Sequence, residues 1–366
     1  MPRRHVAAVT GGEISYLAAG PSDGPLVVLV HGWPATAATW APQLQELGSA
    51  GFCVIAPDMR GYGGSFVPRT PTAYALRHLV EDLRSLIGHR DRQSAVWVGH
   101  DWGAAVVWAL AAHHPEICSA AAGLVVPYRT LDRGLETLVT YVNRAIYPLS
   151  EFPYGQFDYM AYFEESFAEV TALFDTAPDR VVRALYRPGD PSIMEGRSPR
   201  STVRRDGGWF GGATVLPDLP RDANILGDEV YDDLVDTLRS NGFFGPNSYY
   251  LNHVDNNRYS EESVDGGFLH MPTLFIESQY EPTADTIRTR LAEPMRERCT
   301  NLTEVSLAAG HWVGLEKPSE VNAALAQWMQ AAVHPHGGRR RRRHPGGSYA
   351  VAAEKNSHGR HPHQRK

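Results

Sequence analysis

Short apolar runs of strand length alternate with stretches of helical period through the first 127 residues. Strands that are buried on both faces form continuous apolar runs, and their alternation with helices is typical of a mostly parallel sheet covered by helices. The expected strands are a hairpin that turns at Gly11-Gly12 and the runs 25–30, 52–56, 95–98 and 120–126. The expected helices are 39–47, 75–87 and 102–113. The pattern predicts an α/β fold.

The alternation stops between Pro127 and about His270, in a stretch that is rich in Tyr and Phe and has helical segments. It returns with expected strands at 272–277 and 303–307 and expected helices at 284–297 and 320–329. This insertion predicts a core formed by residues 1–127 and 271–333, with a mainly helical cap at 128–270. The Gly-rich segment 207–214 lacks the spacing of a phosphate-binding loop, so a plain loop is expected there.

The last 33 residues differ sharply in composition from the rest of the chain. Residues 334–366 hold nine Lys or Arg against one acid, Glu354, so they carry a formal net charge of +8 and the remaining residues carry −14. With almost nothing apolar to bury, this basic tail is predicted to be disordered. Basic runs contact nucleic acid or anionic surfaces in some proteins. A solvated tail without a specific partner is the favoured interpretation, because the acidic body is not typical of a nucleic-acid-binding protein.

The cysteines and the apolar runs indicate a compartment. Cys53, Cys118 and Cys299 lie far apart and are odd in number, which excludes a disulfide framework or a paired-cysteine metal motif and suits a reducing compartment. The first residues lack the apolar centre of a secretory signal, and no apolar run reaches the length of a bilayer span. We expect a cytoplasmic protein without a membrane partner.

The segment 97–103, W-V-G-H-D-W-G, joins an expected strand to an expected helix and places Asp101 at the bend. A strand, Gly-x-nucleophile-x-Gly and a helix make up a nucleophile elbow, in which the turn lifts one side chain above the end of the strand. Ligand sites of open α/β sheets lie at that end of the strands. An acid that only caps the following helix is the structural alternative. The context favours Asp101 as a nucleophile.

A carboxylate nucleophile is suited to displacement at an sp³ carbon that bears a leaving group, which forms an alkyl ester on the enzyme. Hydrolysis of that ester requires an activated water and donors for a transient oxyanion. The segment 31–34, H-G-W-P, follows the strand 25–30, so the backbone N–H groups of Trp33 and Trp102 are the expected oxyanion donors. A simple strand-ending turn is the alternative for residues 31–34.

The expected general base is His311, on a loop between the last strand and the last helix. It stands where the chain order of nucleophile, acid and histidine requires it. The acid that orients it should follow the strand 272–277, where Glu277, Glu281 and Asp285 are candidates. Glu277 ends the strand and Asp285 enters the expected helix. Glu281 is therefore favoured, with Glu277 left open as the alternative.

Four motifs together resemble the soluble epoxide hydrolases of the α/β-hydrolase superfamily: H-G-W-P, D-M-R-G-Y-G-G-S, G-H-D-W-G-A and G-H-W-V-G-L-E-K-P-S-E-V. The resemblance covers about residues 5 to 330. It implies the α/β-hydrolase fold with an inserted helical cap, and hydrolysis of an epoxide to a vicinal diol without metal or organic cofactor. The resemblance also implies substrate contacts for the motif residues His31, Pro34, His100 and Trp312. Glu281 stands where the family usually has Asp.

Epoxide opening leaves an alkoxide, which needs proton donors, and the resemblance implies that two cap tyrosines supply them. The first lies in F-D-Y-M-A-Y-F-E-E, which makes it Tyr159, and the second follows Gly-Phe-x-Gly-Pro, which makes it Tyr250. A phenol is a suitable donor because its ordinary pKa is near 10. Packing is the alternative for any cap tyrosine, and it is the interpretation favoured for Tyr162 and Tyr249.

Haloalkane dehalogenases also carry an Asp-Trp pair at the elbow, so a dehalogenase is the alternative enzyme. That family often has Asn at the third position of H-G-x-P, where this chain has Trp33, and fluoroacetate-type dehalogenases have Arg in the place of Trp102. A non-catalytic ligand-binding protein is the alternative from another class, and the pair of Asp101 and His311 disfavours it. The expected partners are a small apolar epoxide, indicated by the aromatic cap, and water. The chain is expected to be a monomer or a homodimer.

Overall fold

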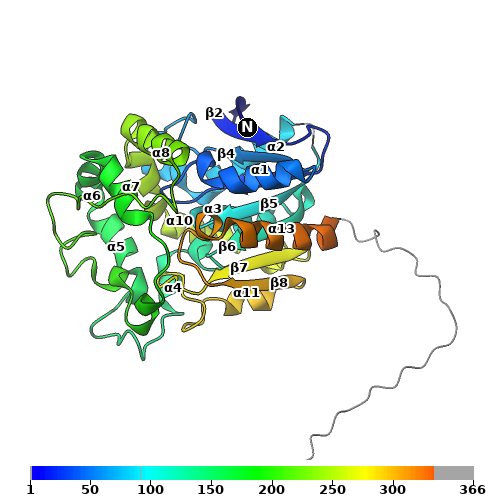
Figure 1. Cartoon of the computed structure of the whole chain (residues 1–366). Coiled ribbons are helices and arrows are strands. Elements are labelled where there is room, and N and C mark those ends of the chain that lie inside the picture. The colour runs from blue at the N-terminus through cyan, green and yellow to red at the C-terminus, as the bar shows by residue number, and fades with distance from the viewer. Residues whose placement is uncertain (1, 91, 334–366) are drawn as a thin grey trace, which may run out of the picture. The chain divides into compact units, whose positions relative to one another are not determined.

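The computed structural model describes residues 2–90 and 92–333, whose arrangement is shown in Figure 1. Eight strands form one sheet in the order β1-β2-β4-β3-β5-β6-β7-β8. They are β1 Arg3–Val9, β2 Gly12–Ala19, β3 Leu26–Val30, β4 Cys53–Pro57, β5 Ala95–His100, β6 Cys118–Leu124, β7 Thr273–Ser278 and β8 Leu302–Leu307. The hairpin β1–β2 is antiparallel and β2 is antiparallel to β4, whereas every pair from β4 to β8 is parallel. The predicted α/β class with a mostly parallel sheet is confirmed.

The helices that cover the sheet are α1 Ala41–Ser49, α2 Leu76–Gly88, α3 Trp102–His113, α11 Glu293–Arg298, α12 Val313–Glu316 and α13 Pro318–Val333. The helices α1 and α13 pack together in front of the sheet in Figure 1, while α2 packs on α3, which lies against β5 and β6. The central strands β3 and β5 are buried along their whole length, which is why each is a continuous apolar run. The helix α3 is apolar on all sides for the same reason, because it is buried from Trp102 to Ala112.

Between β6 and β7 the chain is mainly helical, as the change of sequence pattern predicts. The helices there are α4 Leu135–Val139, α5 Asp158–Glu165, α6 Phe167–Asp175, α7 Pro178–Leu185, α8 Asp228–Asn241, α9 Phe244–Ser248 and α10 His253–Glu261. Figure 1 shows α4 to α8 gathered at one side of the sheet. We call residues 128–270 the cap, and these boundaries stay a prediction.

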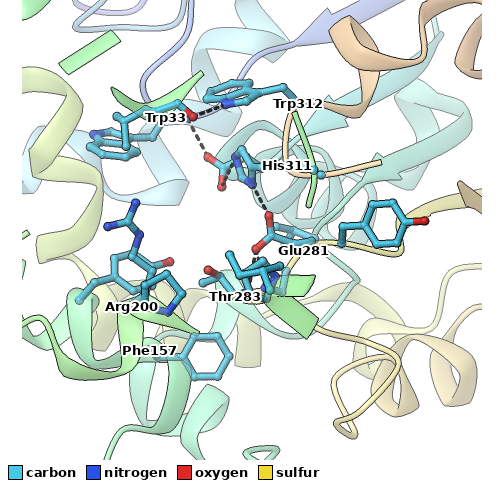
Figure 2. Close-up of a pocket in the computed structure, with 18 of the residues that line it drawn as sticks. Trp33, Phe157, Arg200, Glu281, Thr283, His311 and Trp312 are labelled. Carbon is cyan, nitrogen blue, oxygen red and sulfur yellow. Dashed lines mark hydrogen bonds and ion pairs between the residues drawn. The ribbon is translucent and has the colours of Figure 1, made fainter. Parts of the chain in front are cut away.

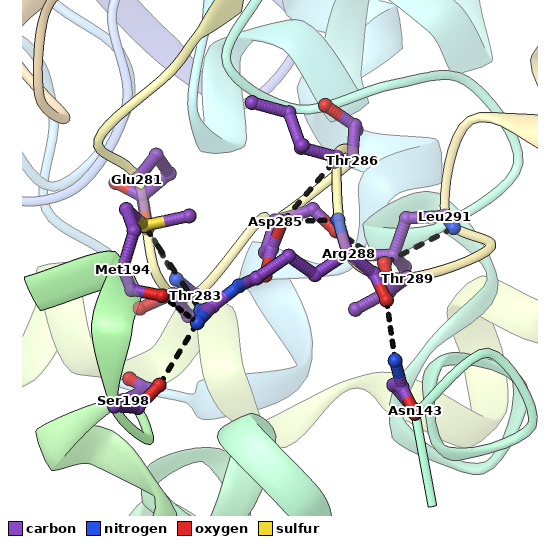
Figure 3. Close-up of polar contacts among 12 residues, drawn as sticks. Asn143, Met194, Ser198, Glu281, Thr283, Asp285, Thr286, Arg288, Thr289 and Leu291 are labelled. Atoms are coloured by element: carbon purple, nitrogen blue, oxygen red, sulfur yellow. Dashed lines mark hydrogen bonds and ion pairs between the residues drawn. The ribbon is translucent and has the colours of Figure 1, made fainter. Parts of the chain in front are cut away.

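The predicted helix at 284–297 is wrong, because only α11 forms there and it begins at Glu293. Asp285 instead closes a tight turn, in which its carboxylate accepts the backbone N–H groups of Ile287 and Arg288. The Arg288 guanidinium pairs with Asp285 at 2.6 Å and also donates to the carbonyl of Met194 in the cap (Figure 3). These contacts hold the segment after β7 as a loop, which lies against the cap.

Three further expectations concern the whole chain. Cys53, Cys118 and Cys299 are buried and free. Among the described residues, no helix is both long enough and apolar enough to cross a membrane. The predicted basic tail, residues 334–366, lies outside the described residues.

Candidate active site

Asp101 occupies the bend between β5 and α3, in a conformation that is rare for any residue other than glycine (φ 54°, ψ −124°). The flanking glycines are required by close backbone contacts. A Cβ atom on Gly99 would lie 2.2 Å from the carbonyl oxygen of Gly103, and one on Gly103 would lie 2.1 Å from that of Val30. The side chain of Asp101 makes no capping hydrogen bond to α3. The geometry is therefore that of an elbow rather than of a helix cap.

One oxygen of the Asp101 carboxylate faces the loop that follows β3. The backbone N–H of Trp33 donates to Oδ1 of Asp101 at 2.8 Å (Figure 2). Gly32 makes this approach possible, because a Cβ atom there would lie 2.5 Å from the same oxygen. Burial raises the pKa of Asp101 above its ordinary value, and the charge of His311 and the N–H groups of Trp33 and Trp102 only partly oppose that effect. Trp33 thus directs a backbone donor at the nucleophile's own carboxylate, where sequence reasoning expects an oxyanion hole.

His311 lies between the two carboxylates. Its Nδ1 is 2.8 Å from Oε2 of Glu281, and its Nε2 is 3.9 Å from Oδ2 of Asp101. Burial lowers the pKa of His311, but the carboxylates of Glu281 and Asp101 outweigh burial and raise it above its ordinary value. Because Glu281 only accepts, Nδ1 carries the hydrogen and Nε2 is left facing Asp101.

Glu281 is the one of the three candidate acids that contacts His311. Its other oxygen accepts the backbone N–H groups of Thr283 and Ala284 at 2.7 and 3.2 Å. Burial alone would raise the pKa of Glu281, but His311 and the two backbone donors lower it to about 2, so the carboxylate is ionised. Glu277 is turned away, since it accepts the hydroxyl groups of Thr286 and Ser306. Asp285 is bonded to Arg288, as described above.

Tyr159 and Tyr250 lie together on the cap side of the same cavity. Tyr159 belongs to α5 and Tyr250 to the turn Tyr249–Leu251, and their ring centroids are 5.8 Å apart with nearly perpendicular planes. Burial is the main reason why the pKa of each phenol is raised, so both stay protonated at neutral pH. Tyr162 and Tyr249 do not line the cavity of the described structure, and the hydroxyl of Tyr249 donates to the carbonyl of Arg60 at 3.2 Å.

The cavity that joins these groups has a volume of about 410 Å³. Asp101, Glu281 and His311 line it from the strand ends, and Tyr159 and Tyr250 line it from the cap. Sequence reasoning did not single out most of the other lining residues, among them Arg200 and Trp209. Trp209 lies in the Gly-rich segment 207–214, which is a loop as predicted, but its ring is buried in the cavity wall.

Comparison with known proteins identifies the fold and the family. A family model described as the alpha/beta hydrolase fold matches residues 25–195. The chain is 32% identical over 343 residues to epoxide hydrolase A of Mycobacterium tuberculosis. The alignment covers 90% of this chain and 97% of that protein. The chain belongs to the epoxide hydrolase family.

Further relatives extend the likeness to structure. Epoxide hydrolase B of Mycobacterium tuberculosis is 30% identical over 87% of this chain and 96% of its own length. The crystal structure of epoxide hydrolase A from Mycobacterium thermoresistibile superposes with a TM-score of 0.74 at 32% identity, over 90% of this chain and 98% of that one. The resemblance to epoxide hydrolases that the four sequence motifs carry is confirmed.

Among the epoxide hydrolase motif residues expected to contact the substrate, only Trp312 lines the cavity of the described structure. His31 lies behind the wall, with Nδ1 bonded to the carbonyl of Gly32 and Nε2 accepting the N–H of Met59. Burial is the main cause that lowers the pKa of His31, so the ring is neutral and holds the loop that carries Trp33.

His100 and Pro34 also lie outside the lining of the described cavity, and each supports a residue that is inside it. His100 donates from Nε2 to the carbonyl of His311 at 2.7 Å, and burial is the main cause that lowers its pKa to about 3. The carbonyl of Pro34 accepts the hydroxyl of Tyr186 at 2.7 Å, and Tyr186 stacks on Trp312 with 3.7 Å between ring centroids. The motifs therefore identify residues that support the site, but His100 and Pro34 contact neighbouring protein groups instead of lining the cavity.

Proposed function

We propose that this protein hydrolyses an epoxide to a vicinal diol through a covalent ester on Asp101. The observation that carries the proposal is the cavity itself, in which one carboxylate faces two protonated phenols and has a carboxylate-oriented histidine beside it. The relatives named epoxide hydrolases support the same reaction.

In the first half of the reaction, Oδ2 of Asp101 attacks a ring carbon of the epoxide. The C–O bond of the ring breaks, and its electron pair goes to the ring oxygen. Tyr159 and Tyr250 hydrogen-bond that oxygen and protonate it as the negative charge develops. Burial raises the pKa of both phenols, so they hold their protons until the breaking C–O bond turns the ring oxygen into an alkoxide, which takes one.

In the second half, water cleaves the ester. Nε2 of His311 takes a proton from the water, whose oxygen attacks the Cγ atom of Asp101. The negative charge then falls on Oδ1, which accepts the N–H of Trp33, and the N–H of Trp102 is the expected second donor. Glu281 stabilises the charged imidazole until the intermediate collapses. The ester C–O bond then breaks, the imidazolium of His311 protonates the departing alkoxide to give the diol, and the proton of the new Asp101 carboxyl group returns to the phenolate, which restores the carboxylate.

A haloalkane dehalogenase is the second candidate, and one observation favours it. The indole Nε1 of Trp102 is buried and has no hydrogen-bond partner among the described residues, as a halide donor would be. However, Trp102 does not line the cavity of the described structure, and Nε1 of Trp33 already donates to Asn247 at 3.1 Å. Halide release from 1-bromobutane without turnover of any epoxide would favour this candidate.

Single turnover in H₂¹⁸O, with enzyme in excess over styrene oxide, tests the covalent route. We expect ¹⁸O in the peptide that contains Asp101 and unlabelled oxygen in the first diol, because water attacks the enzyme's carboxyl carbon. Label that enters only the diol, and never Asp101, would show that water opens the ring directly. A protein that binds epoxides tightly without any turnover would instead be a ligand-binding member of the fold.

A further inference from the structure

One segment of the cap lies directly against the loop that carries His311. It is residues 185–190, the end of α7 and the irregular chain after it, and most of it lines the cavity. The two backbones meet at a pair of glycines. A Cβ atom on Gly189 would lie 2.3 Å from the backbone nitrogen of Gly310, and one on Gly310 would lie 2.6 Å from the Cα of Gly189. Glycine permits this approach because it has no side chain, so the cap contacts the residue that precedes the proposed base.

Glu316, the last residue of α12, binds both sides of this contact. Its Oε2 accepts the backbone N–H of Gly310 at 2.8 Å and that of Gly189 at 3.0 Å. Gly189 is 127 residues away in the sequence, so the bond joins the cap to the core. Hydrogen bonds from backbone N–H groups to a carboxylate are stronger than those between neutral groups. One half-buried oxygen atom therefore holds the cap against the start of the His311 loop.

Trp312 makes a second link between the same two segments. Its indole Nε1 donates to the carbonyl of Leu185 at 2.9 Å, and its ring stacks on that of Tyr186. Trp312 follows His311 in the chain, and Figure 2 shows both side chains at the cavity. The base thus lies between Gly310 and Trp312, and each of these neighbours is bound to the cap.

Ester hydrolysis requires an accurate position of the imidazole. Glu281 orients the ring at Nδ1, and His100 donates to the backbone carbonyl of His311 from the core. These two bonds set the direction of the ring and one side of the loop, whereas Glu316 sets the other side relative to the cap. A displacement of about 1 Å at a reacting group can cost about 100-fold in rate. The link through Glu316 therefore bears on the reaction although it lies outside the cavity lining of the described structure.

We propose that Glu316 is a positioning residue, which places His311 for ester hydrolysis by linking its loop to the cap. This inference rests on the function proposed above. The effect passes through Gly310 to His311, and ring opening by Asp101 does not use that histidine. Loss of the link should therefore slow hydrolysis of the ester and leave its formation almost unchanged.

Glu316→Ala removes the acceptor that the two N–H groups share. We expect ester hydrolysis to slow by about 10- to 100-fold, while ester formation from styrene oxide stays within about threefold of the wild type. Glu316→Gln keeps an oxygen that accepts both N–H groups, so its ester hydrolysis should slow by less than about fivefold. Rapid-quench mass spectrometry measures the two rates. Equal losses in both steps would overturn the proposal, because Glu316 would then support the cavity as a whole.

Glu320→Ala is the matched control for loss of a carboxylate. Glu320 lies in the first turn of α13 and is exposed. Neither step should change by more than about threefold in this variant. Slower ester hydrolysis in Glu320→Ala, as large as that in Glu316→Ala, would also overturn the proposal.

Gly189→Ala tests the same link without removing a carboxylate. The new methyl group pushes the cap away from Gly310, so ester hydrolysis should slow as in Glu316→Ala, and the double variant should lose little more than either single one. Gly196→Ala is the control, since a Cβ atom on that cap glycine would meet nothing within 4 Å in the described structure. Additive losses in the double variant would mean that the two residues act separately, against the proposal.

The titration of His311 separates failure of this proposal from failure of the proposed function. Nuclear magnetic resonance of ¹³C-labelled histidine, assigned with His311→Gln, follows this titration without any substrate. Burial lowers the pKa of His311, but Glu281 and Asp101 outweigh burial and raise it above its ordinary value. A displaced loop weakens the contact with Glu281, so the midpoint should fall by at least about half a pH unit in Glu316→Ala. A lower midpoint without turnover of any epoxide would contradict only the proposed function. Turnover with an unchanged midpoint and unchanged ester hydrolysis would contradict only the role of Glu316.

Discussion

The two sides of the cavity are held in different ways. We call the strand-end side the polar floor, formed by Asp101, Glu281 and His311, and the cap side the aromatic roof, formed by Tyr159, Trp209 and Tyr250. In the floor, hydrogen bonds of 2.7 to 3.2 Å orient the acidic groups and the imidazole. In the roof, rings pack on rings at 5.4 to 5.8 Å, and Phe163 stacks on Tyr250 at 4.5 Å. A change in the floor therefore removes a partner from the reaction, whereas loss of a roof hydroxyl leaves the ring in place.

The largest effect is expected in the floor, from Asp101→Asn. An amide is a poor nucleophile, so we expect kcat to fall by about 10⁴-fold or more. The fold should be retained, because the amide oxygen still accepts the N–H of Trp33. Steady-state kinetics on a terminal epoxide and a thermal melt measure the two properties.

Asp132→Asn is the control for burial of a carboxylate. Asp132 is buried outside the lining of the described cavity and accepts the N–H of Thr130 at 2.8 Å. Its substitution should leave kcat within about threefold of the wild type, since it touches no reacting group. Comparable losses in Asp101→Asn and Asp132→Asn would mean that the first acts through structure rather than chemistry.

The second prediction compares two glutamates that follow the same strand. Glu281→Gln removes the charge that orients His311, and hydrolysis of the ester should slow by about 10³-fold while its formation continues. Glu277→Gln should change neither step by more than about threefold, because Glu277 bonds only to Thr286 and Ser306. Mass spectrometry of the quenched protein should find the ester accumulating in Glu281→Gln alone. Accumulation in both variants, or in neither, would break this distinction.

The comparison of floor and roof also explains what the sequence could predict. The floor follows from local order, because apolar runs mark the central strands. Asp101 comes directly after β5, and His311 lies on the loop that follows β8. The bounds of α3, Trp102–His113, are those that its apolar run predicts. The choice among Glu277, Glu281 and Asp285 depends on how one turn folds. The sequence leaves Glu277 open, and the backbone donors of Thr283 and Ala284 show which carboxylate points inward.

The roof and the loops around it depend on contacts between segments that are far apart in the sequence, and local sequence patterns do not predict such contacts. Arg200 and Trp209 lie in irregular chain, so no helical or strand period marks the side that they present to the cavity. The expected helix at 284–297 is wrong for a related reason. Its sequence permits a helix, but the bond from Arg288 to the carbonyl of Met194, 94 residues away, holds it as a loop. Tyr159 and Tyr250 could be found only because they stand in recognisable motifs.

The third prediction concerns the roof and is smaller. Tyr159→Phe and Tyr250→Phe should each slow formation of the ester by about tenfold, because the remaining phenol still protonates the ring oxygen, and the double variant should slow it by about 10³-fold. Hydrolysis of the ester should be unchanged in all three variants. Stopped-flow tryptophan fluorescence separates the two steps. Tyr162→Phe, outside the lining of the described cavity, is the control for loss of a cap hydroxyl. A loss in either single variant as large as that in the double variant would show that only one phenol protonates.

The smallest expected effect is a difference between the floor and the roof in how the two reaction steps depend on pH. The base in the floor, His311, must be neutral, and its pKa lies above the ordinary value because Glu281 and Asp101 outweigh the lowering effect of burial. Hydrolysis of the ester should therefore slow as the pH falls through that pKa. In the ester Asp101 carries no charge, so the midpoint of this pH dependence should lie below the pKa of His311 in the free enzyme, and Glu281→Gln should lower it further.

The roof determines how ester formation depends on alkaline pH. Burial raises the pKa of Tyr159 and Tyr250, so ester formation should show no alkaline loss up to about pH 10. Rapid-quench measurements give the rates of ester formation and ester hydrolysis at each pH. An alkaline loss of ester formation well below pH 10 would mean that a group other than these two phenols donates the proton.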